Sequence, residues 1–288
     1  MGLNWEIQDK ICLITGANVG IGKETALALA KMRAHVIMVC RSQPRGEAAR
    51  ADIIQQSGNA KVTLMLADLS VQADVRRLAA EIHHQYDALH VLVNNAGAYF
   101  PQRTVSADGL EMTFALNHLG YFLFTNLLLD LLQQSAPARI VNVSSAAHTH
   151  GRLDFDDLQM ARRYSGFQAY ARSKLANLLF TYELARRLAG TGVTVNAVHP
   201  GAVNTNIWSN VDGLLGQILR FAGRFYFLSA QAGAATPIYL AASPKVSGVT
   251  GQYFAKQKTV RSSPESYRTD VAIRLWDASA ALTGLDVA

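Results

Sequence analysis

A tyrosine and a lysine four residues apart, Tyr170 and Lys174, are the side chains of this sequence best suited to move a proton. On a helix, residues four apart lie on one face, one turn above each other, so the ammonium group can lie beneath the phenol oxygen. A free phenol has a pKa of about 10, and a nearby cation favours the tyrosinate. The pair therefore predicts an acid–base site. Because Tyr-x-x-x-Lys also occurs on ordinary helix surfaces, the rest of the chain must support this interpretation.

The composition indicates one large core and no nucleic-acid module. Half of the 288 residues are hydrophobic, which suits a single domain. Cys12 and Cys40 lie in short apolar runs, so we expect packing thiols in a reducing compartment. The net charge of +6 suits an anionic cofactor, a membrane surface or nucleic acid, but no arginine-rich run is interleaved with aromatics. Residues 1–10 carry no signal sequence, and the apolar segment 119–132 is too short to span a bilayer, so we expect no transmembrane helix.

A glycine-rich stretch follows the first apolar run. Residues 11–14 predict a strand, Thr15-Gly-Ala-Asn-Val-Gly-Ile-Gly22 a turn, and residues 23–32 a helix. Glycines let the backbone approach a pyrophosphate, whose charge is met by the free amides and positive dipole end of the helix. The spacing is Gly-x-x-x-Gly-x-Gly, so the commonest dinucleotide fingerprint is not met and a plain tight turn is the alternative.

The end of the second predicted strand, residues 35–40, indicates which dinucleotide would bind. An acidic side chain at this place would bind the ribose 2′-hydroxyl of NAD. The sequence instead has Arg41, with Arg45 nearby. A guanidinium suits a 2′-phosphate by charge and by its fork of donors, which predicts NADP; an arginine at a strand edge with no ligand is the alternative.

Polar residues follow the next strands. Asp68 closes a strand over 62–67 and could accept from an adenine amino group, or cap the helix that begins near Val71. Asn94-Asn-Ala-Gly97 follows a strand at 91–93 and predicts a cofactor wall, with a simple turn as the alternative. Residues 108–132 predict one long helix whose apolar face packs on the sheet, a partner subunit, or both, with the polar Asn117 inside it.

Two serines and two histidines come after the fifth predicted strand, residues 139–143. Ser144 and Ser145 lie at its carboxyl end. His148 and His150 could suggest a metal, but no third ligand is spaced with them, so we expect none.

Strands and helices alternate along the chain. A helix over 167–189 carries Tyr170, and a strand over 194–199 ends in Pro200-Gly201. We expect a further helix over 230–242, kinked at its internal proline, a seventh strand over 251–254, and a C-terminal helix with Ser263 as N-cap and Pro264 first. This alternation predicts an α/β fold with a doubly wound parallel sheet, whose ligand lies outside the carboxyl ends of the strands.

Taken together, these motifs resemble the short-chain dehydrogenase/reductase family over nearly the whole chain. Within it, the chain looks most like the retinol dehydrogenase branch. The family motifs are Thr15–Gly22, Asn94–Gly97, Ser145, Tyr170–Lys174 and Pro200-Gly201, and those of the branch are Cys40-Arg41, Leu116–Gly120, Ser173–Asn177, His199–Gly201 and Arg274–Trp276. The resemblance implies a single Rossmann-type domain of about seven strands with helices on both faces, divided into a core (10–200), a substrate lid (206–229) and a C-terminal extension (255–288).

The resemblance also implies a catalytic tetrad of Asn117, Ser145, Tyr170 and Lys174. Ser145 would hydrogen-bond the substrate oxygen, and Tyr170 would exchange a proton with it. Lys174 would keep the phenol acidic and hold the nicotinamide ribose, while Asn117 would position a water for proton relay. The implied cofactor-binding residues are Gly16, Asn18, Gly20, Ile21, Gly22, Arg41, Asp68, Leu69, Asn95, Ala96, Gly97, Tyr170, Lys174, Pro200, Gly201, Val203 and Thr205.

The expected activity is NADP(H)-dependent interconversion of a lipophilic alcohol and its aldehyde or ketone. Residues 206–229 are apolar with interposed arginines, which suits a lipophilic substrate, a peripheral membrane contact, or packing within the lid or a subunit interface. Reduction of a carbon–carbon double bond, as in the related protochlorophyllide reductases, and a catalytically silent NADP-binding sensor or scaffold are the alternatives. We expect a cytoplasmic protein, peripheral at a membrane if the lid touches one, forming a homodimer or tetramer, with no nucleic-acid partner.

Overall fold

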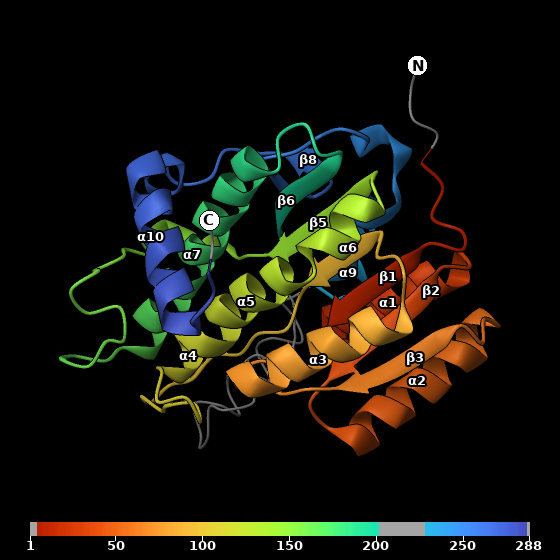
Figure 1. Ribbon diagram of the computed structural model, residues 1–288, viewed down its shortest axis with the longest axis horizontal. Coiled ribbons are helices and arrows are strands. Elements are labelled where there is room, and N and C mark those ends of the chain that lie inside the picture. Colours follow the sequence, from red (N-terminus) through yellow and green to blue (C-terminus); the bar gives the residue numbers. More distant parts are fainter. Residues whose placement is uncertain (1–4, 202–227, 287–288) are drawn as a thin grey trace.

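A single eight-stranded sheet organises the computed structural model, which describes residues 5–201 and 228–286 (Figure 1). The strand order is β3-β2-β1-β4-β5-β6-β7-β8, and every neighbouring pair is parallel except β7 with β8. The order reverses between β1 and β4, which is where sheets of this kind form a ligand crevice. The strands are β1 (Ile11–Thr15), β2 (His35–Cys40), β3 (Val62–Leu66), β4 (Val91–Asn94), β5 (Ala138–Val143), β6 (Val193–His199), β7 (Gln252–Ala255) and β8 (Lys258–Thr259). The predicted doubly wound parallel sheet is confirmed, with the short antiparallel β8 added to the expected seven strands.

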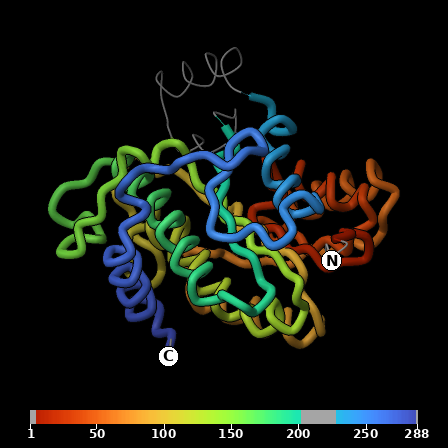
Figure 2. The backbone as a smooth tube through the Cα atoms, turned by 90° about the horizontal axis from the view of Figure 1, so that it is seen from above, coloured from red at the N-terminus to blue at the C-terminus, as the bar shows by residue number. Residues whose placement is uncertain are grey.

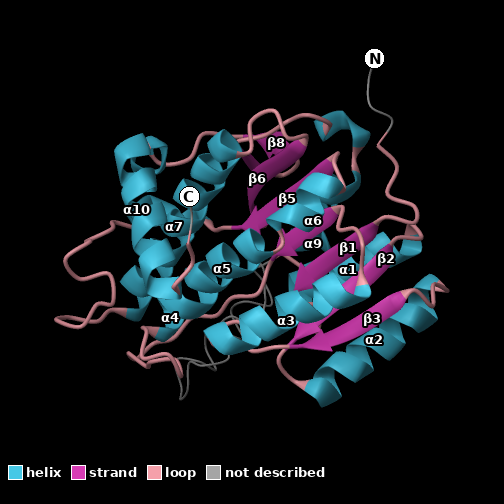
Figure 3. Ribbon diagram, in the orientation of Figure 1, coloured by secondary structure: helices cyan, strands magenta, loops and turns pink. Residues whose placement is uncertain are grey.

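Helices cover both faces of this sheet (Figure 3). They are α1 (Gly20–Lys31), α2 (Gln43–Ser57), α3 (Gln72–Gln85), α4 (Met112–Phe114), α5 (Gly120–Leu127), α6 (Leu129–Gln134), α7 (Gly166–Arg187), α9 (Ala230–Ala242) and α10 (Thr269–Thr283). None of the helices in the described ranges is long and apolar enough to cross a membrane.

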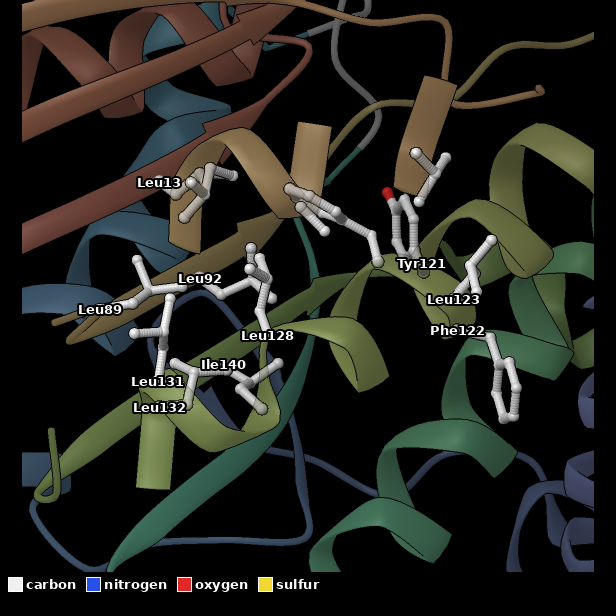
Figure 4. Packing of buried hydrophobic residues seen from close by; sticks show 14 of the residues in the cluster. Leu13, Leu89, Leu92, Tyr121, Phe122, Leu123, Leu128, Leu131, Leu132 and Ile140 are labelled. Atoms are coloured by element: carbon white, nitrogen blue, oxygen red, sulfur yellow. The ribbon is translucent and has the colours of Figure 1, made fainter. Parts of the chain in front are cut away.

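Alternation along the strands divides the core into two main layers. In β1, Leu13 packs with α3, α5, α6 and α7 on one face, whereas Cys12 and Ile14 pack with α1, α2 and α9 on the other. Figure 4 shows part of the first layer, which includes the fully buried ring of Tyr121. Cys12 and Cys40 are free, buried thiols whose pKa values burial raises, in agreement with the predicted packing role.

The single helix predicted over residues 108–132 is wrong. The segment is divided into α4, a π-helical turn (Ala115–Leu119), α5 and α6, with a break at Leu128 between the last two. Its apolar face packs on the sheet and, through Phe122, on the ring of Trp276 in α10, with the ring centroids 5.0 Å apart. A partner subunit was one of the expected covers for this apolar face. Part of the face is instead covered by α10 of the same chain.

The C-terminal segment, described here over residues 255–286, crosses the molecule and runs along α7, as the blue tube beside the green one shows (Figure 2). The prediction that Ser263 and Pro264 begin the last helix is wrong. They begin a short 3₁₀ turn (Pro264–Tyr267), and α10 starts only at Thr269.

A buried arginine joins β5 to α9 and to the amino-terminal segment. Arg139 is 4% exposed, and its guanidinium donates to the carbonyl oxygens of Leu240 (3.0 Å) and Ser243 (2.8 Å) at the carboxyl end of α9. The ring of Trp5 lies 3.8 Å from the guanidinium carbon and covers it. A cation at this place satisfies the last carbonyls of a helix and complements its dipole.

Candidate active site

The glycine-rich turn is forced into its shape by close approach to the turn after β4. Gly16 and Gly20 have φ of +66° and +60°, a region that favours glycine. A Cβ at Gly16 would lie 2.9 Å from the Cα of Ala96, and one at Gly22 would lie 2.5 Å from the Asn95 amide nitrogen. Larger side chains would therefore separate the two turns.

Hydrogen bonds make these two turns one unit. The Thr15 hydroxyl oxygen accepts from the backbone amides of Asn95 (2.9 Å) and Ala96 (3.0 Å), and the Asn95 side chain donates to the Thr15 carbonyl (2.8 Å). Sequence reasoning placed Thr15 in the motif but did not single it out as a site residue. A hydroxyl at the last position of β1, where the strand order reverses, is the signal that could have identified it.

The amino end of α1 fits an anionic group. Its N-cap residue, Val19, offers no side-chain hydrogen bond, and the first turn contains no acidic residue. The free amides and the positive end of the dipole therefore point at the crevice without a competing carboxylate. Asn18, Gly20 and Ile21 lie in this turn, as predicted for a pyrophosphate cradle.

Arg41 and Asp68 come together at the ends of β2 and β3. The Arg41 side chain is 67% exposed, and its guanidinium lies 3.4 Å from an Asp68 carboxylate oxygen. The other carboxylate oxygen accepts from the amide (3.0 Å) and hydroxyl (2.6 Å) of Ser70. The alternative that Asp68 caps the next helix is not observed, because Val71 is the N-cap of α3. Asp68 instead fixes its own turn and orients Arg41 at the edge of the crevice.

The two serines after β5 have different surroundings. The Ser144 hydroxyl is buried and donates to the Lys174 carbonyl oxygen (2.8 Å), so it serves the structure. The Ser145 hydroxyl oxygen accepts from the Ala147 amide (3.2 Å), and its interaction with Tyr170 lowers the pKa of that phenol. Since a hydroxyl both donates and accepts, Ser145 can hydrogen-bond a substrate oxygen.

Helix α7 presents Tyr170 and Lys174 to the same edge. The Lys174 Nζ donates to the Val143 carbonyl oxygen (3.1 Å) and lies 5.6 Å from the centroid of the Tyr170 ring. Burial lowers the pKa of Lys174 to about 7. Burial also raises the pKa of Tyr170 to about 12, against a smaller lowering by the Ser145 hydrogen bond. Desolvation outweighs this hydrogen bond, so the pKa of the phenol lies above its ordinary value.

Asn117 lies in the π-helical turn, beside Gly97 and Lys174. Its side-chain oxygen accepts from the Ala98 amide (2.9 Å), and its nitrogen donates to the Ala98 carbonyl (2.9 Å) and to the Ser173 hydroxyl (3.1 Å). A Cβ at Gly97 would lie 3.1 Å from the Asn117 oxygen and 3.5 Å from the Lys174 Nζ. The side chain thus holds Gly97 and Ala98 next to the lysine, and π-turns of this kind often mark functional sites.

Pro200 and Gly201, after β6, reach the same carboxyl edge, where Gly201 has a φ of +93°. Val203, Thr205 and residues 206–227 of the expected lid lie outside the described residues.

Tyr121 lies beside Lys174, although the sequence placed it only within a long apolar helix. Its ring lies 5.7 Å from the Lys174 Nζ, so the ammonium is within cation–π range of both Tyr121 and Tyr170. Burial, and secondarily Tyr170, raises the pKa of its phenol. Its spacing four residues after Asn117 was the available signal.

In the ranges that the structure describes, no group of three or more His, Cys, Asp or Glu side chains could hold a metal ion. One edge of the sheet instead brings together the residues predicted for the site: Ser145, Tyr170, Lys174, Asn117 and the two glycine-containing turns. This arrangement suits a dinucleotide and a proton-transfer step.

The profile of the short chain dehydrogenase family matches residues 10–213. The chain belongs to the short-chain dehydrogenase family. It is 43% identical to human retinol dehydrogenase 13 over 285 residues, covering 97% of this chain and 86% of that protein. Mouse retinol dehydrogenase 12 is 44% identical over 282 residues, covering 98% and 89%. These relatives place the chain in the retinol dehydrogenase branch, as predicted, and it is an oxidoreductase acting on alcohol and carbonyl groups.

Solved structures agree with this fold. A putative uncharacterized protein from Mycobacterium paratuberculosis superposes with a TM-score of 0.78 at 32% identity, covering 99% of this chain and 98% of that one. A short chain dehydrogenase from Burkholderia cenocepacia, solved in complex with NADP, gives 0.68 at 26% identity, covering 86% and 96%. A nicotinamide cofactor is accordingly the natural occupant of the crevice.

Proposed function

We propose that this oxidoreductase uses NADP(H) to interconvert a lipophilic alcohol and its aldehyde or ketone, with Tyr170 as the acid and base. The observation that carries the proposal is the meeting of Ser145, Tyr170 and Lys174 beside the two joined turns of the crevice. The solved relative that binds NADP and the retinol dehydrogenases among the curated relatives support the cofactor and the substrate class.

The residues at the crevice fit a phosphorylated dinucleotide. The uncapped end of α1 would receive the pyrophosphate, and the exposed Arg41 guanidinium would bind the 2′-phosphate. When bound, the nicotinamide supplies or accepts the hydride. Lys174 would bind its ribose hydroxyls, since the ammonium has donors beyond the one used by Val143.

In the direction of reduction, Ser145 donates a hydrogen bond to the substrate oxygen as negative charge develops on it. Tyr170 then gives its phenol proton to that oxygen, and its high pKa in the protein keeps the proton available at neutral pH. In oxidation the phenolate must take the proton back, and the cationic form of Lys174 favours that phenolate. Asn117 keeps Ala98 and Gly97 beside Lys174, and its predicted part in a water relay remains a prediction.

The apolar composition of residues 206–229 supports a lipophilic substrate. We further propose a reducing, cytoplasmic location, which the two free thiols support, with peripheral membrane contact through the same apolar segment.

The test is oxidation of NADPH, followed at 340 nm, with all-trans-retinal, medium-chain aldehydes, a steroid ketone and a small quinone. Tyr170→Phe should lower kcat about 10²- to 10⁴-fold, the usual size of general acid catalysis. Tyr86→Phe is the matched control, because Tyr86 ends α3 and its ring packs on His35 (centroids 5.4 Å apart), which begins β2 at the opposite edge of the sheet from Tyr170. Tight NADPH binding with no turnover of any substrate would favour a silent sensor instead.

A further inference from the structure

His148 has both ring nitrogens engaged, one of them with the backbone of Ser145. The imidazole is 2% exposed; its Nδ1 lies 2.7 Å from the Ser145 carbonyl oxygen, and its Nε2 lies 3.0 Å from the Ser263 backbone nitrogen. A backbone N–H can only donate, so Nε2 is the acceptor. Nδ1 therefore carries the proton and donates to Ser145, which fixes one neutral tautomer.

We infer that His148 is a positioning residue, which holds Ser145 in place by tying its backbone to the C-terminal segment. This inference rests on the proposed function, in which the Ser145 hydroxyl binds the substrate oxygen. The imidazole touches neither the cofactor crevice turns nor Tyr170 through any hydrogen bond of the described residues, so it acts through Ser145 alone.

The anchor at Ser263 is itself fixed to the helix that carries Tyr170. The neighbouring Ser262 hydroxyl is bonded to the Tyr182 phenol (2.7 Å), and the Tyr182 and Tyr267 rings stack with centroids 5.3 Å apart. His148 thus connects the serine loop to α7 through the C-terminal segment. Because Tyr170 belongs to α7, this connection sets the separation of the serine and tyrosine hydroxyls.

A second imidazole holds the other side of the same loop. The His199 Nδ1 accepts from the backbone amides of Ala146 (3.3 Å) and Gly201 (3.4 Å). The backbone on either side of the Ser145–Ala146 peptide is therefore bonded to β6 and to the C-terminal segment. The edge of the Tyr253 ring, 5.2 Å from the His148 ring, restricts how far that ring can turn.

Two substitutions of His148 separate its hydrogen bonds from its volume. His148→Phe keeps a buried ring and removes both bonds. His148→Asn places an amide nitrogen near the position of Nδ1, so donation to the Ser145 carbonyl survives. Misplacing a reacting group by about 1 Å can cost roughly 100-fold in rate, so we expect kcat to fall about 10- to 100-fold in His148→Phe and at most about threefold in His148→Asn. NADPH affinity should stay within about twofold in both, because the crevice turns are untouched.

Ser263→Pro tests the anchor while residue 148 stays a histidine. Ser263 has φ −63° and ψ 149°, which proline also adopts. The substitution removes the amide that donates to Nε2, and the proline ring takes the place of that hydrogen and displaces the imidazole from its anchor. We expect kcat to fall about three- to tenfold. His150→Asn is the control, because His150 is exposed and lies two residues beyond His148.

Long-range ¹H–¹⁵N NMR of the histidines gives a readout that needs no turnover. The wild-type protein should show His148 protonated at Nδ1, and Ser263→Pro should lose that preference. An Nε2-protonated His148 in the wild type would overturn the inference, as would folded His148→Phe with kcat within twofold of wild type, or equal losses in His148→Phe and His148→Asn. Absence of turnover in the wild type would refute the proposed function and leave the NMR result to decide the tautomer and its anchor.

Discussion

Replacing Arg41 by aspartate should convert a preference for NADPH into indifference or a preference for NADH. The guanidinium stands at the end of β2, oriented by Asp68 and two-thirds exposed. A charge-assisted hydrogen bond contributes about 1.5 to 3 kcal/mol, and exposure places this one at the low end. A new carboxylate near the 2′-phosphate adds repulsion of about 1 kcal/mol in water at 4 Å. Arg41→Asp should therefore weaken NADPH binding by roughly 30- to 150-fold.

NADH should be affected by no more than about threefold, because it has no 2′-phosphate and its ribose hydroxyl can donate to the new carboxylate. Dissociation constants from the fluorescence of each reduced cofactor measure the difference. Added salt should narrow the NADPH preference of the wild type, since exposed charges are screened.

Arg33→Asp is the matched control. Arg33 is exposed, has a φ of +63° that aspartate tolerates better, and lies just before β2, at the opposite end of the strand from Arg41. The six residues of β2 separate the two positions by roughly 20 Å, beyond the screening length at physiological salt. It removes the same charge and should leave both dissociation constants unchanged. Equal losses of NADPH and NADH in Arg41→Asp would refute the reasoning and leave Arg41 as a partner of Asp68 alone.

Three other predictions concern proton transfer and stability. Because burial raises the pKa of Tyr170 to about 12, alcohol oxidation should accelerate as pH rises from 7 to 10 while carbonyl reduction does not, and oxidation rates independent of pH over this range would contradict this. Burial in the folded state lowers the pKa of Lys174 to about 7, so the unfolded state binds more protons than the folded state between pH 7 and 10. The lysine should therefore oppose folding at neutral pH, and this effect should fade as the pH rises. Lys174→Met should remove the effect, as measured by denaturant titrations of the free energy of unfolding at several pH values. Arg139→Met should leave the carbonyls at the end of α9 without their donor and lower the free energy of unfolding by roughly 3 kcal/mol, or Tm by about 5 to 10 °C in thermal denaturation. NADPH binding should be unchanged. A Tm within 1 °C of wild type would show that water replaces the guanidinium.

The strands and most helices were predictable because the spacing of their apolar residues indicates which positions are buried. β2 was predicted to the residue, and α9 as well, despite Pro237 within it. The two-residue β8 was missed because both of its residues are exposed and too few to show alternation. The helix over 108–132 was predicted as continuous because hydrophobic periodicity does not show where the backbone hydrogen bonds change to the π-helical pattern.

The site was predicted in composition but not in electrostatics. Spacing identified Tyr170 and Lys174, and the distribution of polar residues at strand ends identified Arg41 and the serines. The pKa of the phenol could not be predicted, because it depends on how completely α7, β5 and their loops exclude water. The role of His148 was hidden for a similar reason: its partner at Ser263 lies 115 residues away, and only the fold brings them together.

The stack of Trp5 on Arg139 bears on where this protein can be cut. The family match begins at residue 10, after Trp5, and a fragment started there would keep every strand and every predicted site residue. It would also remove the ring that shields a buried guanidinium, together with the indole hydrogen bond to the Ala241 carbonyl (3.1 Å). Water would then reach the carboxyl end of α9, whose other end leads back to the segment expected to cover the substrate. Fragment boundaries taken from sequence matches alone would therefore loosen α9, even though no residue of the candidate active site had been touched.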